Sequence, residues 1–181
     1  MENQIKNQLT PDEKIIWEGK PDKKSFLFMG PSWFIIPFTF LWFGFALFWE
    51  ITAWVSGAPT FFLLFGGLFV AMGFYIAIGR FFVAGKEYDN LYYVLTDKRA
   101  LIQQGISNLE FQSVDLKKVS DIELHLKSTG KGDIVFGSKG VMRFYIPGWP
   151  MMKKWYSLPP AFYGIDNAQE LYKKISELKG F

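Results

Sequence analysis

The sequence predicts an α+β membrane protein: an N-terminal transmembrane helical hairpin, then a curled antiparallel β-sheet or barrel, and one C-terminal amphipathic helix. Two apolar runs between Trp33 and Phe82 predict the hairpin. Short alternating runs after Tyr88, separated by turn residues, predict the sheet. Apolar residues at helical spacing near the C-terminus predict the last helix.

The hairpin is expected within residues 33–84, with helices at about 33–55 and 60–82. The seventeen residues from Trp33 to Trp49 and the twenty from Thr60 to Gly79 carry no charge. Because a helix rises about 1.5 Å per residue and the hydrocarbon layer is about 30 Å thick, about twenty such residues cross it. Neither run has the polar stripe of a soluble helix, and the short join at 56–59 makes the helices antiparallel neighbours.

The distribution of charge predicts the orientation of the hairpin. Lys20, Lys23 and Lys24 precede the first helix, Arg80 and Lys86 follow the second, and the connecting turn has no positive charge. Basic residues favour the cytoplasmic side, so we expect a multi-pass protein of the cell inner (cytoplasmic) membrane with both termini cytoplasmic. The first thirty residues are too polar for a removable signal peptide, so the first membrane helix is expected to act as the insertion signal.

Residues 1–32 are expected to form an amphipathic cytosolic lead-in. Thr10 is a capping residue, Pro11 suits the first helical position, and Glu13 follows three residues after the cap, which predicts a short helix through about Trp17. Ile15, Ile16 and Trp17 either pack on the folded domain or lie at the lipid headgroups.

The membrane helices contain four small residues at the spacing typical of helix packing. Gly67 with Ala71 and Gly73 with Ala77 form two small-xxx-small pairs, which pack either within the hairpin or against a second copy or partner. Glu50 and Arg80 lie at opposite ends of the hairpin and cannot pair with each other, which indicates interfacial groups rather than a proton path.

The C-terminal domain is expected at residues 86–181, with short strands at 91–95, 99–104, 108–113, 121–126, 133–136 and 141–146. Asp166 can cap the terminal helix. Its apolar stripe consists of Ala168, Leu171, Tyr172, Ile175 and Leu178.

Three motifs resemble bacterial pleckstrin-homology (PH) domain membrane proteins: Leu9 to Lys14 with Trp17, Tyr92 to Leu101 with Gly105, and Phe162 to Ile165. The resemblance covers nearly the whole chain and implies a PH-like fold held at the membrane. Its Thr96 to Arg99 segment is interpreted as a tight turn, and the Pro-rich stretch 147–160 looks longer than the family's connection. PH-like folds serve many tasks, so the resemblance implies no ligand.

Residues 134–165 are the most informative polar feature, because they hold four basic residues and no acid. We expect membrane contact there, with basic groups at anionic headgroups and aromatic and methionine side chains at the interface. The residues are Lys139, Arg143, Trp149, Met151, Met152, Lys153, Lys154, Trp155 and Tyr156. The alternative is a loop folded over the sheet, with its aromatic side chains in the core.

Lys127 and Lys131 flank glycine-rich turns that, by the resemblance, could surround a headgroup pocket; a solvated loop is the alternative. No catalytic, cofactor or metal site is expected. The chain has no cysteine and a single histidine, and Gly130 to Gly132 lacks the glycine and hydroxyl of a P-loop. A net charge of +3 is modest for nucleic-acid binding.

The sequence therefore predicts a non-enzymatic scaffold or binding protein that contacts anionic lipid headgroups or a partner protein at the cytosolic face of the membrane. The alternative is a small accessory subunit of a larger membrane complex. Expected partners are membrane lipids and a protein partner or second copy bound through the helices, without nucleic acid.

Overall fold

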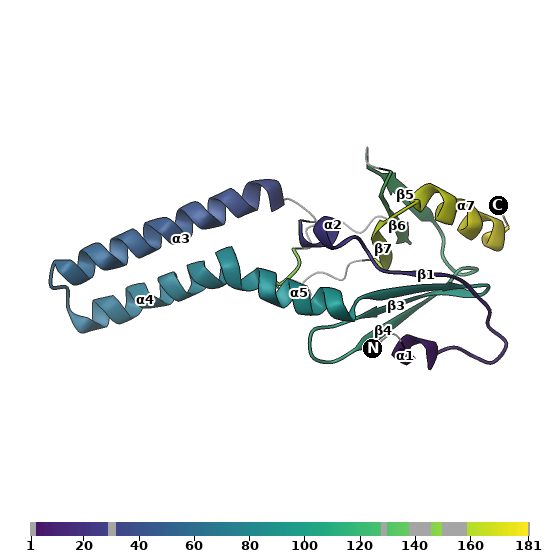
Figure 1. Ribbon diagram of the computed structural model, residues 1–181, viewed down its shortest axis with the longest axis horizontal. Coiled ribbons are helices and arrows are strands. Elements are labelled where there is room, and N and C mark those ends of the chain that lie inside the picture. The colour runs from purple at the N-terminus through teal and green to yellow at the C-terminus, as the bar shows by residue number, and fades with distance from the viewer. Residues whose placement is uncertain (1–2, 29–31, 128–129, 138–145, 150–158, 181) are drawn as a thin grey trace.

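The computed structural model describes residues 3–28, 32–127, 130–137, 146–149 and 159–180. A long helical hairpin projects from one end of an α+β domain (Figure 1). The first and last described helices in the sequence, α1 (Asn3–Lys6) and α7 (Ala168–Lys179), both lie on the domain, away from the hairpin tip.

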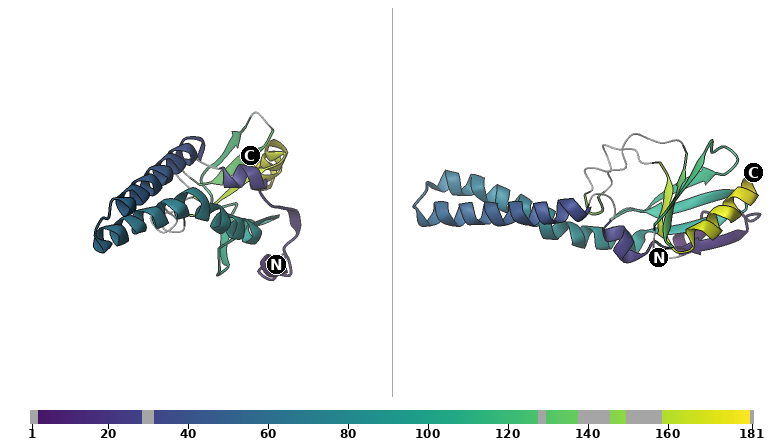
Figure 2. Two further views of the ribbon diagram at one scale, coloured as in Figure 1. Left: turned by 60° about the vertical axis from the view of Figure 1, so that its left-hand side comes forward. Right: turned by 90° about the horizontal axis from the view of Figure 1, so that it is seen from above.

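The hairpin consists of α3 (Ser32–Val55) and α4 (Thr60–Phe74), which run antiparallel and side by side in all views (Figures 1 and 2). The second helix was expected to end near residue 82, but it continues without a break. It passes through the π-helical turn η1 (Tyr75–Gly79) into α5 (Arg80–Asn90). The stretches 34–55 and 60–90 are long and apolar enough to cross a membrane, by length and composition.

The outer surface of the hairpin is apolar. Phe61 exposes 81% of its surface and Leu41 exposes 74%, while Gly66 and Gly73 are buried where the helices meet. Trp49 packs on Phe62 across the interface, with ring centroids 4.9 Å apart. Contiguous exposed apolar surface of this kind marks contact with lipid or another protein.

A four-stranded antiparallel sheet has the order β1 (Ile15–Gly19), β2 (Tyr92–Thr96), β3 (Arg99–Gln104), β4 (Glu110–Asp115). The predicted helix through Trp17 is wrong, because these residues form β1, with Gly19 opposite Tyr93. Pairing with β2 satisfies the backbone of β1, and this tertiary interaction outweighs the local capping signal. The sheet thus combines residues from before and after the hairpin.

A second antiparallel sheet has the order β5 (Ile122–Leu126), β6 (Gly132–Phe136), β7 (Ala161–Ile165). The expected α+β class with antiparallel strands is confirmed, but the described strands form two sheets rather than one curled sheet. β7 was not predicted as a strand. The strand expected at 141–146 lies outside the described residues except for Ile146, which is not in a strand.

Phe162 of β7 lies at the centre of the core between the sheets. Its ring centroid is 4.8 Å from that of Tyr93, 5.0 Å from that of Phe136 and 5.7 Å from that of Trp17. The terminal helix α7 closes this core against β5 and β6, burying Leu171 and Ile175 as predicted. Its N-cap is Asn167, with φ of 53°, rather than the expected Asp166.

Candidate functional site at the helix–domain junction

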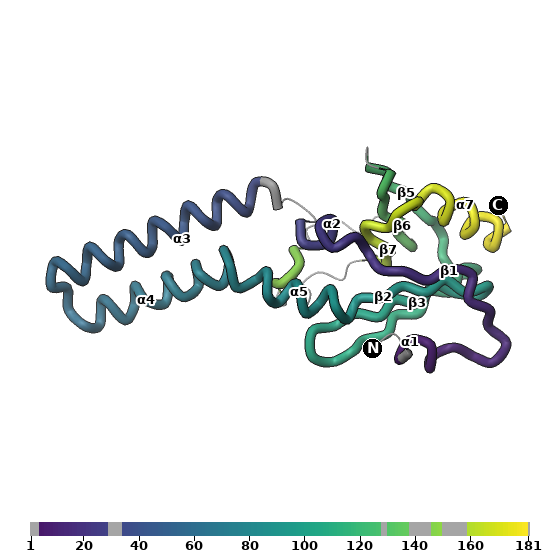
Figure 3. The backbone as a smooth tube through the Cα atoms, viewed as in Figure 1, coloured from purple at the N-terminus to yellow at the C-terminus, as the bar shows by residue number. Residues whose placement is uncertain are grey.

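Segment 146–149 lies against the helix where the hairpin enters the domain (Figure 3, yellow-green beside α5). The Tyr75 hydroxyl of η1 donates a hydrogen bond of 2.9 Å to the Gly148 carbonyl. The Gly148 N–H donates to a carboxylate oxygen of Glu87, 3.5 Å away. Gly148 has φ of 81°, and a Cβ there would collide with the Arg80 carbonyl oxygen. Only glycine therefore allows this contact without strain.

Arg80 is the most unusual side chain of the junction. It is 1% exposed, and its three guanidinium nitrogens have no hydrogen-bond partner among the described residues. Its guanidinium carbon lies over the Phe81 ring, 4.4 Å from the ring centre. The indole nitrogen of Trp149, next to Gly148, is also buried without a partner. Both groups can only donate hydrogen bonds, so the junction has unused donors.

Glu50 of α3 lies inside the hairpin rather than at its surface. Its Oε2 atom is buried with no hydrogen-bond partner from any described residue and contacts Gly66 of α4, where a Cβ would collide with it. A neighbouring apolar hollow of about 310 Å³ opens between the two helices. Its lining residues are Trp42, Phe45, Ala46, Trp49, Phe65, Gly66 and Phe69.

The four predicted small residues divide between the two faces of the hairpin. Gly73 is buried against Phe43 of α3, and Ala77 is fully buried. Gly67 has open space at its Cβ position, and Ala71 is exposed. Sequence reasoning missed Gly66, whose spacing of seven residues from Gly73 was the available signal for a shared inward face.

Of the predicted membrane-contact residues, one lies within the part of the chain that the structure describes. Lys139, Arg143, Met151, Met152, Lys153, Lys154, Trp155 and Tyr156 lie outside the described residues. Trp149 is described and half-buried at the junction. The sequence signal for Arg80 is that it is a single charge at the end of a twenty-residue apolar run.

Lys127 and Lys131, predicted beside a headgroup pocket, make ion pairs within the protein. The Lys131 ammonium lies 2.8 Å from a carboxylate oxygen of Asp22 and 3.6 Å from one of Asp166. Lys127 lies 3.8 Å from Asp133. Asp22 also accepts the Ser25 N–H at the start of α2 (Lys23–Leu27). The bond from Lys131, together with that N–H, lowers the pKa of Asp22 to about 2.

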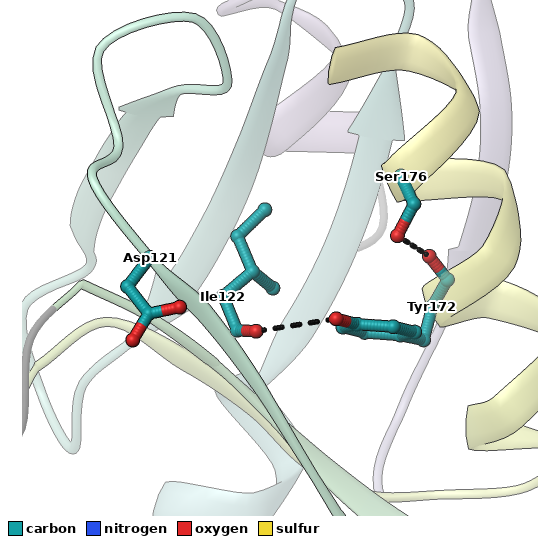
Figure 4. Close-up of a pocket in the computed structure, with 4 residues that line it drawn as sticks. All are labelled: Asp121, Ile122, Tyr172 and Ser176. Carbon is teal, nitrogen blue, oxygen red and sulfur yellow. Dashed lines mark hydrogen bonds between the residues drawn. The ribbon is translucent and has the colours of Figure 1, made fainter. Parts of the chain in front are cut away.

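A hollow of about 240 Å³ lies between α7 and β5 (Figure 4). The Tyr172 hydroxyl donates to the Ile122 carbonyl at 3.5 Å, and the Ser176 hydroxyl donates to the Tyr172 carbonyl at 3.0 Å. Asp121 completes the lining. The Ser176 bond thus lies within α7, and the Tyr172 bond joins α7 to β5.

The segment from Thr96 to Arg99 forms the tight turn predicted between β2 and β3. The Thr96 hydroxyl accepts the backbone N–H groups of Lys98 and Arg99, at 3.2 and 3.0 Å. Asp97 accepts the Lys14 N–H at 3.0 Å. Two motifs that lie far apart in the sequence are therefore in direct contact.

No protein-family model matches the chain, and no curated protein matches it. Among solved structures, the chain is similar to the crystal structure of a DUF1696 family protein with a pleckstrin-homology domain from Shewanella loihica PV-4. The two are 14% identical, with a TM-score of 0.33, over 49% of this chain and 70% of that chain.

Proposed function

We propose that the chain is a non-enzymatic protein of the bacterial inner membrane whose PH-like domain contacts anionic lipid headgroups at the cytosolic face. The observation that carries this proposal is the unbroken helix from Thr60 to Asn90, 31 residues long. At about 1.5 Å per residue it measures about 46 Å, against about 30 Å of hydrocarbon. Its last third, α5, then rises out of the lipid and leads directly into β2.

The connection between helix and sheet supports a domain held close to the membrane. Leu91 alone separates α5 from β2. A domain attached this rigidly lies at a set height above the hairpin, and it needs little affinity of its own to contact headgroups. The PH-like assignment of the domain draws on its two antiparallel sheets, its terminal helix and the motif resemblance.

The basic residues beside the hairpin support anionic headgroups as the partner. Lys20, Lys23 and Lys24 precede α3, at the end of the hairpin that also carries Arg80 and Lys86. The ammonium of Lys23 lies 5.7 Å from the centre of the Tyr88 ring of α5, which positions α2 beside the helix. Each basic residue near an anionic surface contributes about 1 kcal/mol of attraction.

The test uses the full chain, because the sheet needs β1 from before the hairpin. We would reconstitute the protein in nanodiscs of phosphatidylcholine with or without phosphatidylglycerol and measure hydrogen exchange over residues 20–28. Greater protection in anionic discs, lost in high salt, is the expected result. The combined variant Lys20→Gln, Lys23→Gln and Lys24→Gln should lose that protection. The control Lys117→Gln with Lys118→Gln, on the turn after β4, should keep it. Equal protection in both discs would refute headgroup contact.

A second candidate function is an accessory subunit of a larger membrane complex. The outward position of Gly67 and Ala71 favours it, because small outward residues allow another helix to approach closely. Size-exclusion chromatography with light scattering in mild detergent tests this. A second copy or co-purifying chain that is lost in Gly67→Leu supports the subunit, whereas a monomer counts against it.

A further inference from the structure

The junction holds an arginine without an acceptor. Arg80 is 1% exposed, yet Nε, Nη1 and Nη2 have no hydrogen-bond partner in the part of the chain that the structure describes. Burying an unpaired charge is among the costliest arrangements in a protein. An anion bound to these nitrogens would remove that cost, because a guanidinium presents paired donors that match an oxyanion.

A second donor at the junction also has no acceptor. The Trp149 indole N–H is buried without a partner, and Trp149 follows Gly148, which touches the Arg80 backbone. The neighbouring polar groups are already used: the Tyr75 hydroxyl donates to the Gly148 carbonyl, and Glu87 accepts the Gly148 N–H. These bonds hold segment 146–149 on the helix, with Gly148 against the Arg80 backbone and Trp149 next in the chain.

The height of Arg80 along the hairpin indicates which anion is near. Arg80 lies twenty residues after Thr60, the first residue of α4. At about 1.5 Å per residue this is about 30 Å, the thickness of the hydrocarbon layer. In a membrane-spanning hairpin, Arg80 therefore lies at the boundary where lipid phosphates begin.

We propose that Arg80 and the Trp149 indole N–H bind one phosphate oxyanion at the helix–domain junction. The phosphate belongs to an anionic lipid headgroup or is free inorganic phosphate. This inference rests on the proposed membrane anchoring and adds a defined binding site to it. The site differs from the predicted lysine pocket, whose Lys131 is paired with Asp22.

The experiment uses the full chain, delipidated in a neutral maltoside detergent at constant ionic strength. Thermal unfolding is followed while dihexanoyl phosphatidylglycerol, dihexanoyl phosphatidylcholine or inorganic phosphate is added. We expect a saturable rise in Tm for the wild type. Arg80→Gln should weaken the apparent affinity about tenfold or more, and Trp149→Phe, which keeps an aromatic ring, about three- to tenfold. The control Lys118→Gln should match the wild type.

The three added compounds distinguish the sources of the phosphate. A response to phosphatidylglycerol alone identifies the anionic headgroup, and an equal response to inorganic phosphate identifies the free ion. A wild-type affinity in Arg80→Gln would overturn the site. The proposed function would stand even then, provided that wild-type protection is greater in anionic nanodiscs and the triple lysine variant loses it. Without any response in the wild type, and with equal protection in both discs, both proposals fail.

Stability without ligand gives an independent readout. With no anion present, Arg80→Met should raise Tm, because it replaces an unpaired buried charge by an apolar chain of similar length. An arginine with an acceptor inside the protein would give the opposite result. A lower Tm for Arg80→Met in phosphate-free detergent would therefore overturn the proposal.

Discussion

Arg99 and Glu13 form a bidentate ion pair that ties the N-terminal segment to the first residue of β3. The Arg99 Nε atom lies 2.7 Å from Oε1 of Glu13, and Nη2 lies 3.0 Å from Oε2. The same guanidinium donates to the Gln8 carbonyl at 2.8 Å. Burial raises the pKa of Glu13, but the bonds from Arg99 and the Thr10 N–H, together with the nearby positive charges, bring it below its ordinary value, so the carboxylate stays ionised. The pair joins segments from opposite sides of the hairpin.

Arg99→Met should destabilise the protein by about 1–3 kcal/mol, because it removes charge-assisted bonds and leaves the Glu13 carboxylate buried. The Glu13 side chain is only 4% exposed, so water replaces the lost donors poorly. Thermal unfolding of the full chain in detergent measures the effect. Lys118→Met is the control, since its pair with Asp115 is exposed and should contribute about 0–1 kcal/mol. Equal effects of the two variants would contradict this assignment.

The pair of Lys131 with Asp22 should make stability depend on pH in the acid range. The pKa of Asp22 is about 2 in the folded protein and 3.8 as the ordinary value. A carboxyl group whose pKa is lowered by folding stabilises the protein at pH values above its ordinary pKa. This contribution is lost as the pH falls toward and through the pKa of the folded protein. The difference in Tm between wild type and Lys131→Met should be constant above about pH 5 and shrink from pH 4 toward pH 2. A difference that persists unchanged at pH 2 would refute the ion pair.

Gly66→Ala should loosen the hairpin, because the new methyl group meets the Glu50 carboxylate on the facing helix. The carboxylate ends a flexible side chain and can turn aside, but a Trp49 ring atom also lies 3.3 Å from the new methyl group, so we expect the lower end of the range of about 1–3 kcal/mol for overpacking. Gly67→Ala is the matched control: the adjacent position has nothing within 4 Å of a Cβ, so the change should stay within about 1 kcal/mol. Thermal unfolding of both variants in the same detergent tests the assignment of the inward face. If Gly67 rather than Gly66 faced α3, Gly67→Ala would be the more destabilising of the two variants.

Gly148→Ala should release segment 146–149 from the helix. The residue has φ of 81°, and its new Cβ would meet the Arg80 carbonyl, so the cost should be at least about 2 kcal/mol. Hydrogen exchange at the backbone amide of residue 148 should be faster in the variant than in the wild type, because its bond to Glu87 is lost. Gly85→Ala, in the open interior of α5, should instead stabilise the helix by about 0.5–1 kcal/mol. Unchanged exchange at Gly148 would show that this contact does not hold the segment.

The elements predicted correctly are those whose signal lies within their own residues. The apolar runs of the hairpin, the short aromatic and aliphatic runs of β2 and β3, and the stripe of α7 are local patterns. The helix beyond residue 82 was missed because charges at Lys86 and Glu87 end the apolar run without ending the helix. An apolar run predicts where lipid contact stops, not where the backbone changes direction.

The elements predicted incorrectly depend on distant partners. The capping signal of Thr10 and Glu13 is present, and the Thr10 N–H does bond to the Glu13 carboxylate at 3.2 Å, but pairing with β2 makes the next residues a strand. In β7, Gly164 interrupts the alternating pattern, and the strand is stabilised by pairing with β6. The contact of Gly148 with the Arg80 carbonyl likewise joins residues that lie far apart in the sequence.

If the hairpin crosses a membrane as proposed, the position of β1 before it and β2 after it links the completion of the domain to membrane insertion. During synthesis, β1 leaves the ribosome first and has no neighbour until both apolar helices and β2 have followed. If only one helix crossed the bilayer, the two strands would lie in different compartments and could never pair. In the proposed membrane-spanning arrangement, assembly of the sheet would therefore require the correct topology of the hairpin, and a misinserted chain would keep an unpaired strand edge of the kind that pairs with other chains.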